Sequence, residues 1–405
     1  MTNLNNDIRN YMFTASSISL SRIATAIFYI SILWISFTDT HSPIYTGIAD
    51  GLVTLPLFFS FAVGTFVDNS AHKKFIAILF SLIRACSVIP LLFTFFLSQK
   101  AFLIIFLFLF AFSVGLTSDF INSVRAVWIK KFLKEGEKIK RYRAFSNIAY
   151  NISEGVGYIL VGFLITIGVT FTLIFILFIY LISTIPISLI KVNEESKRRQ
   201  QNTGVRKLRD SLNFLRKTPI VLFLFTEGFL INFVFGMFGV LTTVMVVRIF
   251  RLSALYLSII YLILTLGISF GSFLERKEGA PRLDRVLWSI AVLAVMLIAI
   301  SYITQFVYIF LPMFIIGISI GLSEIIIFSG IQNNVPEEIT GTIQGYYNSL
   351  ATGLTFLSAP ITGILVQFTG YHNTFLLISL SSLLIIFIII WRRITINAHN
   401  DKEIN

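Results

Sequence analysis

The chain has 405 residues, of which 56% are hydrophobic and only 13% are charged, and its mean hydropathy is +0.85. Soluble domains are about half apolar and a quarter charged, so this composition excludes an ordinary soluble protein and places most of the chain in lipid. The net charge of +12 does not indicate a nucleic-acid partner, because nucleic-acid-binding proteins gather basic residues on a polar face, whereas the Phe residues here lie in apolar runs.

Neither a disulfide nor a metal site is indicated. Cys86 is the only cysteine, and the four histidines are scattered without the spacing of metal ligands. The pattern Gly-x-x-x-x-Gly-Lys-Ser/Thr is absent, so the chain itself does not encode ATP-driven transport. We expect no cofactor and an ion gradient as the driving force, with protons as the expected ion, although carboxylates serve sodium as well.

Apolar stretches separated by polar residues predict twelve membrane-spanning helices of about 20 residues or more. The first six lie near residues 11–37, 44–67, 75–97, 101–125, 145–167 and 169–190. The other six lie near residues 218–247, 253–274, 286–304, 306–329, 342–367 and 372–391. Residues 286–323 and 339–391 carry no charge, but each run is too long for one crossing of a ~30 Å core, so we divide them near Gln305 and Gly370.

The longest polar segment, residues 191–217, divides the predicted spans six and six. We therefore expect an all-α polytopic membrane protein with an N-terminal bundle over residues 1–190 and a C-terminal bundle with a short tail over residues 218–405. The segment between them is a basic cytoplasmic linker. Apolar residues recur at helical spacing within it, which predicts an amphipathic helix on the inner leaflet, with a solvated linker helix as the alternative.

The distribution of basic residues predicts the orientation. With the N-terminus in the cytoplasm, only Lys100, Arg248 and Arg251 fall in outer loops, and all the other basic residues outside the spans lie on the cytoplasmic side. Both termini would then be cytoplasmic. The first apolar stretch is too long for a signal-peptide core, and we expect a retained first span in a prokaryotic cell membrane.

The two halves resemble each other at an offset of about 205 residues. Residues 64–69 at the end of span two match residues 271–276 at the end of span eight, and residues 162–168 loosely match residues 363–370. A repeat of six-helix bundles is typical of transporters that bind substrate between the halves near the midplane. The pairs Gly267 and Gly271, Gly317 and Gly321, and Gly341 and Gly345 predict close helix packing.

The stretch from Gly64 to Lys73 resembles a loop motif of the major facilitator superfamily, Gly-x-x-x-Asp-Arg-x-Gly-Arg-Arg, which joins spans two and three. It keeps Gly64, Asp68 and a final basic residue, Lys73, and departs from the motif at residues 69, 71 and 72. The resemblance implies that Asp68 caps a neighbouring helix and helps to hold an outward-facing state. The matching group in the second half is Gly271, Glu275 and Arg276.

Three further segments, residues 79–85, 211–219 and 332–341, are similar to the branch of that superfamily that contains macrolide-efflux and enterobactin-export proteins. With the span count, the resemblance covers nearly the whole chain. It implies the superfamily's fold and an exporter, although one fold serves many substrates.

Charged residues inside the predicted spans are costly in lipid and mark cavities or partners. They are Arg22, Arg84, Asp119, Glu154, Glu227 and Glu324, with Asp50 nearer the outer surface. The repeat offset relates Arg22 to Glu227 and Asp119 to Glu324. In the superfamily fold the four helices that carry them line the central cavity.

We therefore hypothesise that Asp119, Glu227 and Glu324 bind protons or a cationic substrate group, and that Arg22 is the counter-ion of one of them. Fixed ion pairs between helices are the alternative. Asn232, little more than one turn from Glu227, is a polar candidate for the same cavity.

Two charged residues carry weaker predictions. Arg84 is expected to serve packing or gating, and Glu154 could be either a gating or a structural residue.

The sequence thus predicts a monomeric, proton-coupled exporter of an amphipathic or hydrophobic small molecule that works by alternating access. An uptake symporter of the same fold is the main alternative. A channel or a membrane-embedded enzyme fits less well, because no cluster of catalytic residues is found.

Overall fold

The structure, a computed structural model, describes residues 2–96, 102–132, 137–192, 213–214, 217–274, 283–336 and 343–383. Every regular element in these segments is helical. Eleven of the helical segments are long and apolar enough to cross a membrane. The twelfth predicted span begins as a helix at residue 371, and its part beyond residue 383 lies outside the described residues. The prediction of an all-α polytopic membrane protein is therefore confirmed.

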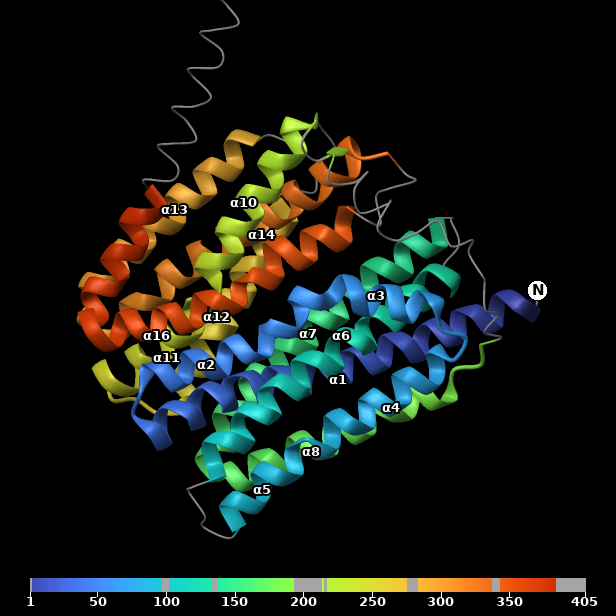
Figure 1. The fold of residues 1–405 in the computed structure, drawn as a ribbon, viewed down its shortest axis with the longest axis horizontal. Helices are drawn as coiled ribbons and strands as arrows, with labels where there is room; N and C mark the ends of the chain where they lie inside the picture. The colour runs from blue at the N-terminus through green and yellow to red at the C-terminus, as the bar shows by residue number, and fades with distance from the viewer. Residues whose placement is uncertain are drawn as a thin grey trace, which may run out of the picture.

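The N-terminal half begins with α1 (Thr2–Thr40), α2 (Pro43–Thr54), the 3₁₀ helix η1 (Leu55–Phe59), α3 (Ser60–Asn69) and α4 (Lys73–Cys86). It continues with α5 (Val88–Phe96), α6 (Leu103–Phe132), α7 (Glu137–Ile167) and α8 (Val169–Leu189). Figure 1 shows these helices packed side by side, in blue to green.

The C-terminal half begins with α10 (Pro219–Phe235), α11 (Phe238–Val244), the π-helical turn η3 (Met245–Ile249), α12 (Ala254–Leu274) and α13 (Leu283–Tyr302). It continues with the 3₁₀ helix η4 (Phe306–Ile309), α14 (Phe310–Asn334), the π-helical turn η5 (Asn348–Thr352), the 3₁₀ helix η6 (Gly353–Leu357) and α16 (Ser358–Thr369). We call the side at which α1 begins and α8 ends the linker side, and the side of the α1–α2 turn the far side (Figure 1).

Both divisions of the charge-free runs are confirmed. α13 ends at Tyr302 and η4 begins at Phe306, on either side of Gln305. α16 ends at Thr369, and Gly370 follows with a φ of 84°, a left-handed conformation that favours glycine and ends the helix. The division into two bundles joined by a linker stays a prediction, because most of residues 191–217, including the predicted amphipathic helix, lies outside the described residues.

The α-helices of spans two and eleven are interrupted by 3₁₀ and π-helical turns at the point where the two spans cross. The apolar runs of the sequence did not predict these interruptions. In the first, Pro56 lies in η1, between α2 and α3. In the second, η5 and η6 interrupt the helix, and Gly353 lies against the backbone of Phe58. Because a proline removes a backbone donor and a glycine lets two chains approach closely, these residues give the halves a tight crossing at mid-span.

The halves pack along two pairs of spans. Spans two and eleven also pack through α2 on α16, where Gly363 lies against the backbone of Pro43, and spans five and eight pack through α7 on α12, where Gly162 lies against Leu255. A twofold relation between similar halves carries spans two and eleven onto spans eight and five, so these two span pairs would be equivalent. Gly162 and Gly363 begin the two stretches that match in the sequence, and they occupy corresponding places.

The predicted glycine contact between spans eight and ten is confirmed. On α12, Gly267 and Gly271 lie against the backbone of α14, and Gly317 and Gly321 of α14 lie against the backbone of α12. Helices that pack through small residues come close enough for extensive backbone contact, which stabilises association where no hydrophobic effect operates between helices.

Candidate functional site

A cavity of about 750 Å³ lies between the two halves. Its polar lining from the N-terminal half comprises Ser21, Arg22, Thr25, Tyr29, Asp50, Thr54, Arg84, Ser118, Asn122, Arg125, Tyr150, Glu154 and Tyr158. Its polar lining from the C-terminal half comprises Asn232, Tyr261, Thr352 and Thr355. Both halves therefore contribute to one site, as alternating access requires, but all the charged residues of the described lining come from the N-terminal half.

Arg22 and Glu154 form an ion pair on the wall of this cavity. Nη1 of Arg22 donates to Oε2 of Glu154 at 2.7 Å, and the hydroxyl of Tyr158 donates to Oε1 of Glu154 at 3.3 Å. The predicted pairing of Arg22 with Asp119, Glu227 or Glu324 is therefore wrong. The reason is that α1 packs along α7 within the same half, which brings the Glu154 carboxylate to Arg22.

Arg84 and Arg125 border the same cavity and are buried, with exposed fractions of 1% and 3%. The Arg84 guanidinium lies 4.3 Å from the centre of the Tyr180 ring, a cation–π contact, and its Nε and Nη2 have no hydrogen-bond partner among the described residues. Nη2 of Arg125 donates to the Ser17 hydroxyl at 2.7 Å and to the Ser17 carbonyl at 3.1 Å. Neither arginine has a carboxylate partner in the described parts of the chain.

Sequence reasoning gave Arg84 a packing or gating role and did not select Arg125 at all. It ended span four at residue 125, whereas α6 continues to Phe132 and carries Arg125 on its cavity face. The signal that could have found it is helical spacing, because Asn122 lies three residues earlier and lines the same cavity.

Asp50 lies where the two halves meet. The sequence placed it nearer the outer side of the membrane, and this depth stays a prediction. Its side chain is buried, with an exposed fraction of 3%, and it lines the cavity. One of its carboxylate oxygens accepts a long, 3.4 Å hydrogen bond from the Tyr29 hydroxyl and lies where a side chain at Gly239 would begin. Glycine at position 239 of α11 therefore lets this carboxylate contact the other half of the protein.

The three acids predicted to bind protons are not among the described residues that line this cavity. Asp119 is buried, and Oδ1 of its carboxylate accepts a 2.7 Å hydrogen bond from the Ser60 hydroxyl. Glu227 is fully buried, with no hydrogen-bond partner for either carboxylate oxygen in the described segments. Glu324 is exposed on α14. Their role in proton binding stays a prediction.

Asn232 does line the cavity, as predicted, and its amide donates to the Gly228 carbonyl one turn earlier at 2.7 Å.

The stretch from Gly64 to Lys73, which resembles the superfamily's loop motif, lies at the linker-side end of α3 and beyond it. Nζ of Lys73 donates to the Asp68 carbonyl at 3.3 Å, so the basic residue caps the end of α3, while the exposed Asp68 carboxylate has no described partner. Gly64 has open space beside it, whereas Gly271 lies against Ile318. Glu275 and Arg276 lie outside the described residues.

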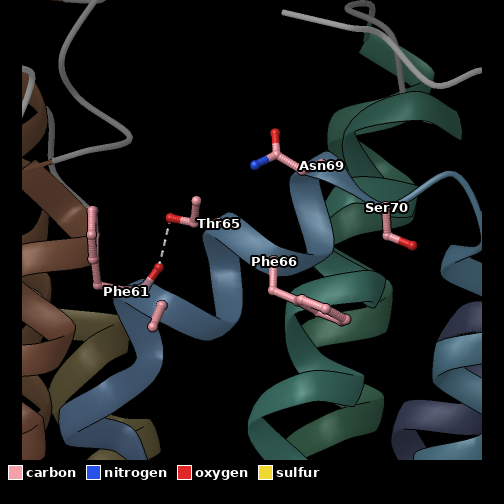
Figure 2. A pocket seen from close by; sticks show the side chains of 6 residues that line it. Phe61, Thr65, Phe66, Asn69 and Ser70 are labelled. Atoms are coloured by element: carbon pink, nitrogen blue, oxygen red, sulfur yellow. Dashed lines mark hydrogen bonds between the residues drawn. The ribbon is translucent and has the colours of Figure 1, made fainter. Parts of the chain in front are cut away.

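A shallow groove runs along this end of α3 and is lined by Phe61, Ala62, Thr65, Phe66, Asn69 and Ser70 (Figure 2). Phe61 is the last residue of α3 with a ring or hydrogen-bond contact to the described C-terminal half: its ring stacks on Tyr346, and its backbone N–H donates to Ser349 at 3.3 Å. Beyond it, Thr65 and Asn69 are exposed, and the Phe66 ring turns to Phe120 of α6. On α3 the two halves therefore separate toward the linker side.

Several solved structures share this fold at low sequence identity. The nucleoside transporter NupG matches with a TM-score of 0.69 at 15% identity, over 95% of this chain and 98% of that one. A POT family transporter in complex with 5-aminolevulinic acid matches with a TM-score of 0.67 at 12% identity, over 94% and 95%. A bacterial homologue of the human lysosomal transporter Spinster matches with a TM-score of 0.66 at 12% identity, over 95% of each chain.

A search of curated protein sequences found no match. The family model of the Major Facilitator Superfamily matches residues 14–357, most of the chain and both halves. Fold, internal pairing of the spans and family model agree, and the chain belongs to the major facilitator superfamily.

Proposed function

We propose that this protein is a secondary transporter that exports an amphipathic small molecule across a prokaryotic cell membrane in exchange for protons. The observation that carries the proposal is the cavity of about 750 Å³ lined by polar groups from both halves of a membrane-spanning protein. Its volume suits a drug-sized molecule, and its lining combines charged groups with the rings of Phe28, Tyr29 and Phe235.

The side to which the cavity opens is inferred from where the halves are in contact. α2 packs on α16 through residues that follow the far-side turn, whereas among the described residues of α3 the ring and hydrogen-bond contacts to the other half end at Phe61. The excess of basic residues favours the linker side as the cytoplasmic side, so the cavity would open to the cytoplasm in this state, which an exporter and an importer share. The resemblance to macrolide-efflux and enterobactin-export proteins supports export, and the chain would act as a monomer.

Proton coupling is inferred from the buried carboxylates. Asp50 lies between the halves, and Glu227 lies fully buried without a described partner. A carboxyl group that loses its hydration holds a proton more readily and releases it when a conformational change brings water or a cation. Opening and closing of the halves around such groups would link proton release to substrate movement.

The test uses everted membrane vesicles with an imposed proton gradient reported by a pH-sensitive dye, and a chemically broad panel of amphipathic compounds. We expect at least one compound to discharge the gradient with the wild-type protein and not with Glu227→Gln. Arg248→Gln, an exposed far-side change, is the matched control and should behave as wild type.

Two outcomes would count against the proposal. If compounds accumulate in right-side-out vesicles together with protons, the protein is an uptake symporter of the same fold. If a sodium gradient drives the exchange and a proton gradient does not, the coupling ion is sodium.

A further inference from the structure

We infer that the cavity binds an anionic group of its substrate, a carboxylate or a phosphate, between Arg84 and Arg125. That the bound anion is part of a transported substrate rests on the proposed function. The anion site itself is inferred from the charges around the cavity. It names the substrate class as amphipathic anions, whereas the sequence alone favoured a lipophilic or cationic molecule.

The charges that border the cavity do not balance. Among the described lining residues there are three cations, Arg22, Arg84 and Arg125, and two acids, Asp50 and Glu154. Glu154 is held by Arg22 at 2.7 Å, and Asp50 lies at the contact with Gly239 of the other half. Two guanidinium groups therefore remain without a carboxylate.

These two arginines are not solvated surface residues whose charge water could neutralise. Their exposed fractions are 1% and 3%, and Nε of each has no hydrogen-bond partner among the described residues. Their contacts among the described residues come from neutral groups: the Tyr180 ring for Arg84, and for Arg125 the Ser17 oxygens and, at 3.5 Å, the side-chain oxygen of Asn122. Burial of an unpaired charge is unfavourable, so such a group is retained where a function needs it.

A ligand anion is the partner that would satisfy both groups at once. Guanidinium groups present parallel N–H donors that match the oxygens of a carboxylate or phosphate, and the resulting charge-assisted bonds are about twice as strong as neutral ones. The Asn122 amide and the Tyr150 hydroxyl line the same cavity and can donate further hydrogen bonds. The Glu154 carboxylate is already paired with Arg22, so among the described lining residues only Asp50, at the contact with Gly239, is an acid without a cationic partner.

The rest of the lining favours a molecule with an apolar body. Phe28 and Phe235 line the cavity from opposite halves. Ile18 lines it from α1, and Ala126 and Ile129 line it from α6, the helix that carries Arg125. A ligand whose anion lies between the arginines would place its apolar part against these side chains. The expected substrate is therefore an amphipathic anion rather than an inorganic ion.

The test measures binding to the purified full-length protein in neutral detergent, so it does not depend on transport. Three probes share one apolar body: 4-phenylbutyrate is anionic, 4-phenylbutanamide is neutral and 4-phenylbutylamine is cationic. Binding is followed by the rise in unfolding temperature, read from tryptophan fluorescence, with increasing probe concentration. We expect 4-phenylbutyrate to bind at least about tenfold more tightly than the other two probes.

The variants assign the effect to the two arginines. Arg84→Gln and Arg125→Gln should each weaken 4-phenylbutyrate binding by at least about tenfold without changing the response to the amide, and the Lys variants should recover part of the affinity. Arg248→Gln removes an exposed positive charge outside the cavity and should leave all three affinities unchanged. In the absence of probe, Arg84→Gln should unfold no earlier than wild type, because it removes an unpaired buried charge.

A lipid headgroup could supply the same anion. The anionic lipid dihexanoylphosphatidylglycerol is therefore compared with the zwitterionic dihexanoylphosphatidylcholine in the same assay. The site is assigned to lipid if dihexanoylphosphatidylglycerol stabilises the protein only when both arginines are present and 4-phenylbutyrate does not stabilise it. Equal affinity for the three phenylbutyl probes, or undiminished 4-phenylbutyrate binding in folded Arg84→Gln and Arg125→Gln, overturns the inference. Loss of proton-coupled transport with intact anion binding would instead contradict the proposed function alone.

Discussion

Nη1 of Arg22 donates to Oε2 of Glu154 at 2.7 Å, which joins α1 to α7 across 132 residues of sequence. The two side chains are 43% and 31% exposed, so water screens the pair from the cavity side. An ion pair of this kind contributes about 1 kcal/mol or less to stability. Its main effect is therefore on the charge of the cavity wall.

Neutralising the two partners should move anion binding in opposite directions. Glu154→Gln leaves the positive charge of Arg22 uncompensated and should tighten 4-phenylbutyrate binding by up to about fivefold, while Arg22→Gln should weaken it by a similar factor. Unfolding temperatures should change little in either variant. The measurement is the same probe titration at low and high salt, and the difference between the variants should shrink as salt rises. A change of the same sign in both variants would contradict an electrostatic role.

The glycine contact between α12 and α14 gives a second prediction. A methyl group at Gly317 would meet the backbone of Leu264 and Gly267, so Gly317→Ala must move two helices apart and should destabilise the protein by about 1–3 kcal/mol. Gly64→Ala is the matched control, because nothing lies within 4 Å of its added carbon, and it should be neutral or stabilising by up to about 1 kcal/mol. Unfolding temperatures of the purified variants at one scan rate test the contrast.

The glycines show what the sequence could predict. Small residues at four-residue spacing on two apolar helices, such as Gly267 and Gly271, predict close packing in lipid, and here that prediction is confirmed. The same spacing at Gly341 and Gly345 does not show close packing at Gly345, whose added carbon would meet only the Phe61 ring at 3.9 Å. The ends of the spans at Gln305 and Gly370 were predictable for a similar reason, because bilayer thickness limits how long an apolar helix can be. These arguments need no knowledge of which helices are neighbours.

The site depends on neighbours, and there the sequence was insufficient. The pairing of Arg22 with Glu154 follows from α1 packing on α7, and the burial of Asp50 follows from Gly239 on another helix. Arg125 was missed because polar residues near the end of an apolar run look like the start of a loop, although α6 continues through them. Hydropathy identifies spans but does not fix the rotation of each helix about its axis.

Asp50 and Gly239 give a third prediction, about the far-side closure. A side chain at Gly239 would collide with the Asp50 carboxylate, so Gly239→Ala should favour separation of the halves on the far side. Asp50→Ala in the same chain should relieve the collision, and the effects of the two changes should not add.

The reporter is Val53→Cys, a cavity position, in a Cys86→Ser background that removes the only other cysteine. A membrane-impermeant maleimide is added to everted and to right-side-out vesicles. With Gly239 and Asp50 intact, the cysteine at position 53 should be labelled from the linker side alone. Gly239→Ala should add labelling from the far side, and Gly239→Ala with Asp50→Ala should again be labelled from the linker side alone. If the Gly239→Ala variant is labelled in the same pattern as the protein that keeps Gly239, the contact between Asp50 and Gly239 does not close the cavity on the far side.

Glu227 gives the last prediction, because burial and function make opposite demands on it. The side chain is fully buried in α10, and neither carboxylate oxygen has a partner among the described residues. Glu227→Met keeps the volume and removes the polar group, so it should stabilise the protein by about 1–3 kcal/mol while it abolishes proton-coupled transport. Asp119→Ala is the contrasting variant: it leaves the Ser60 hydroxyl without its acceptor and should cost about 1 kcal/mol. If Glu227→Met unfolded earlier than wild type, the carboxyl group would be a structural partner, and the coupled proton would have to be sought at Asp50.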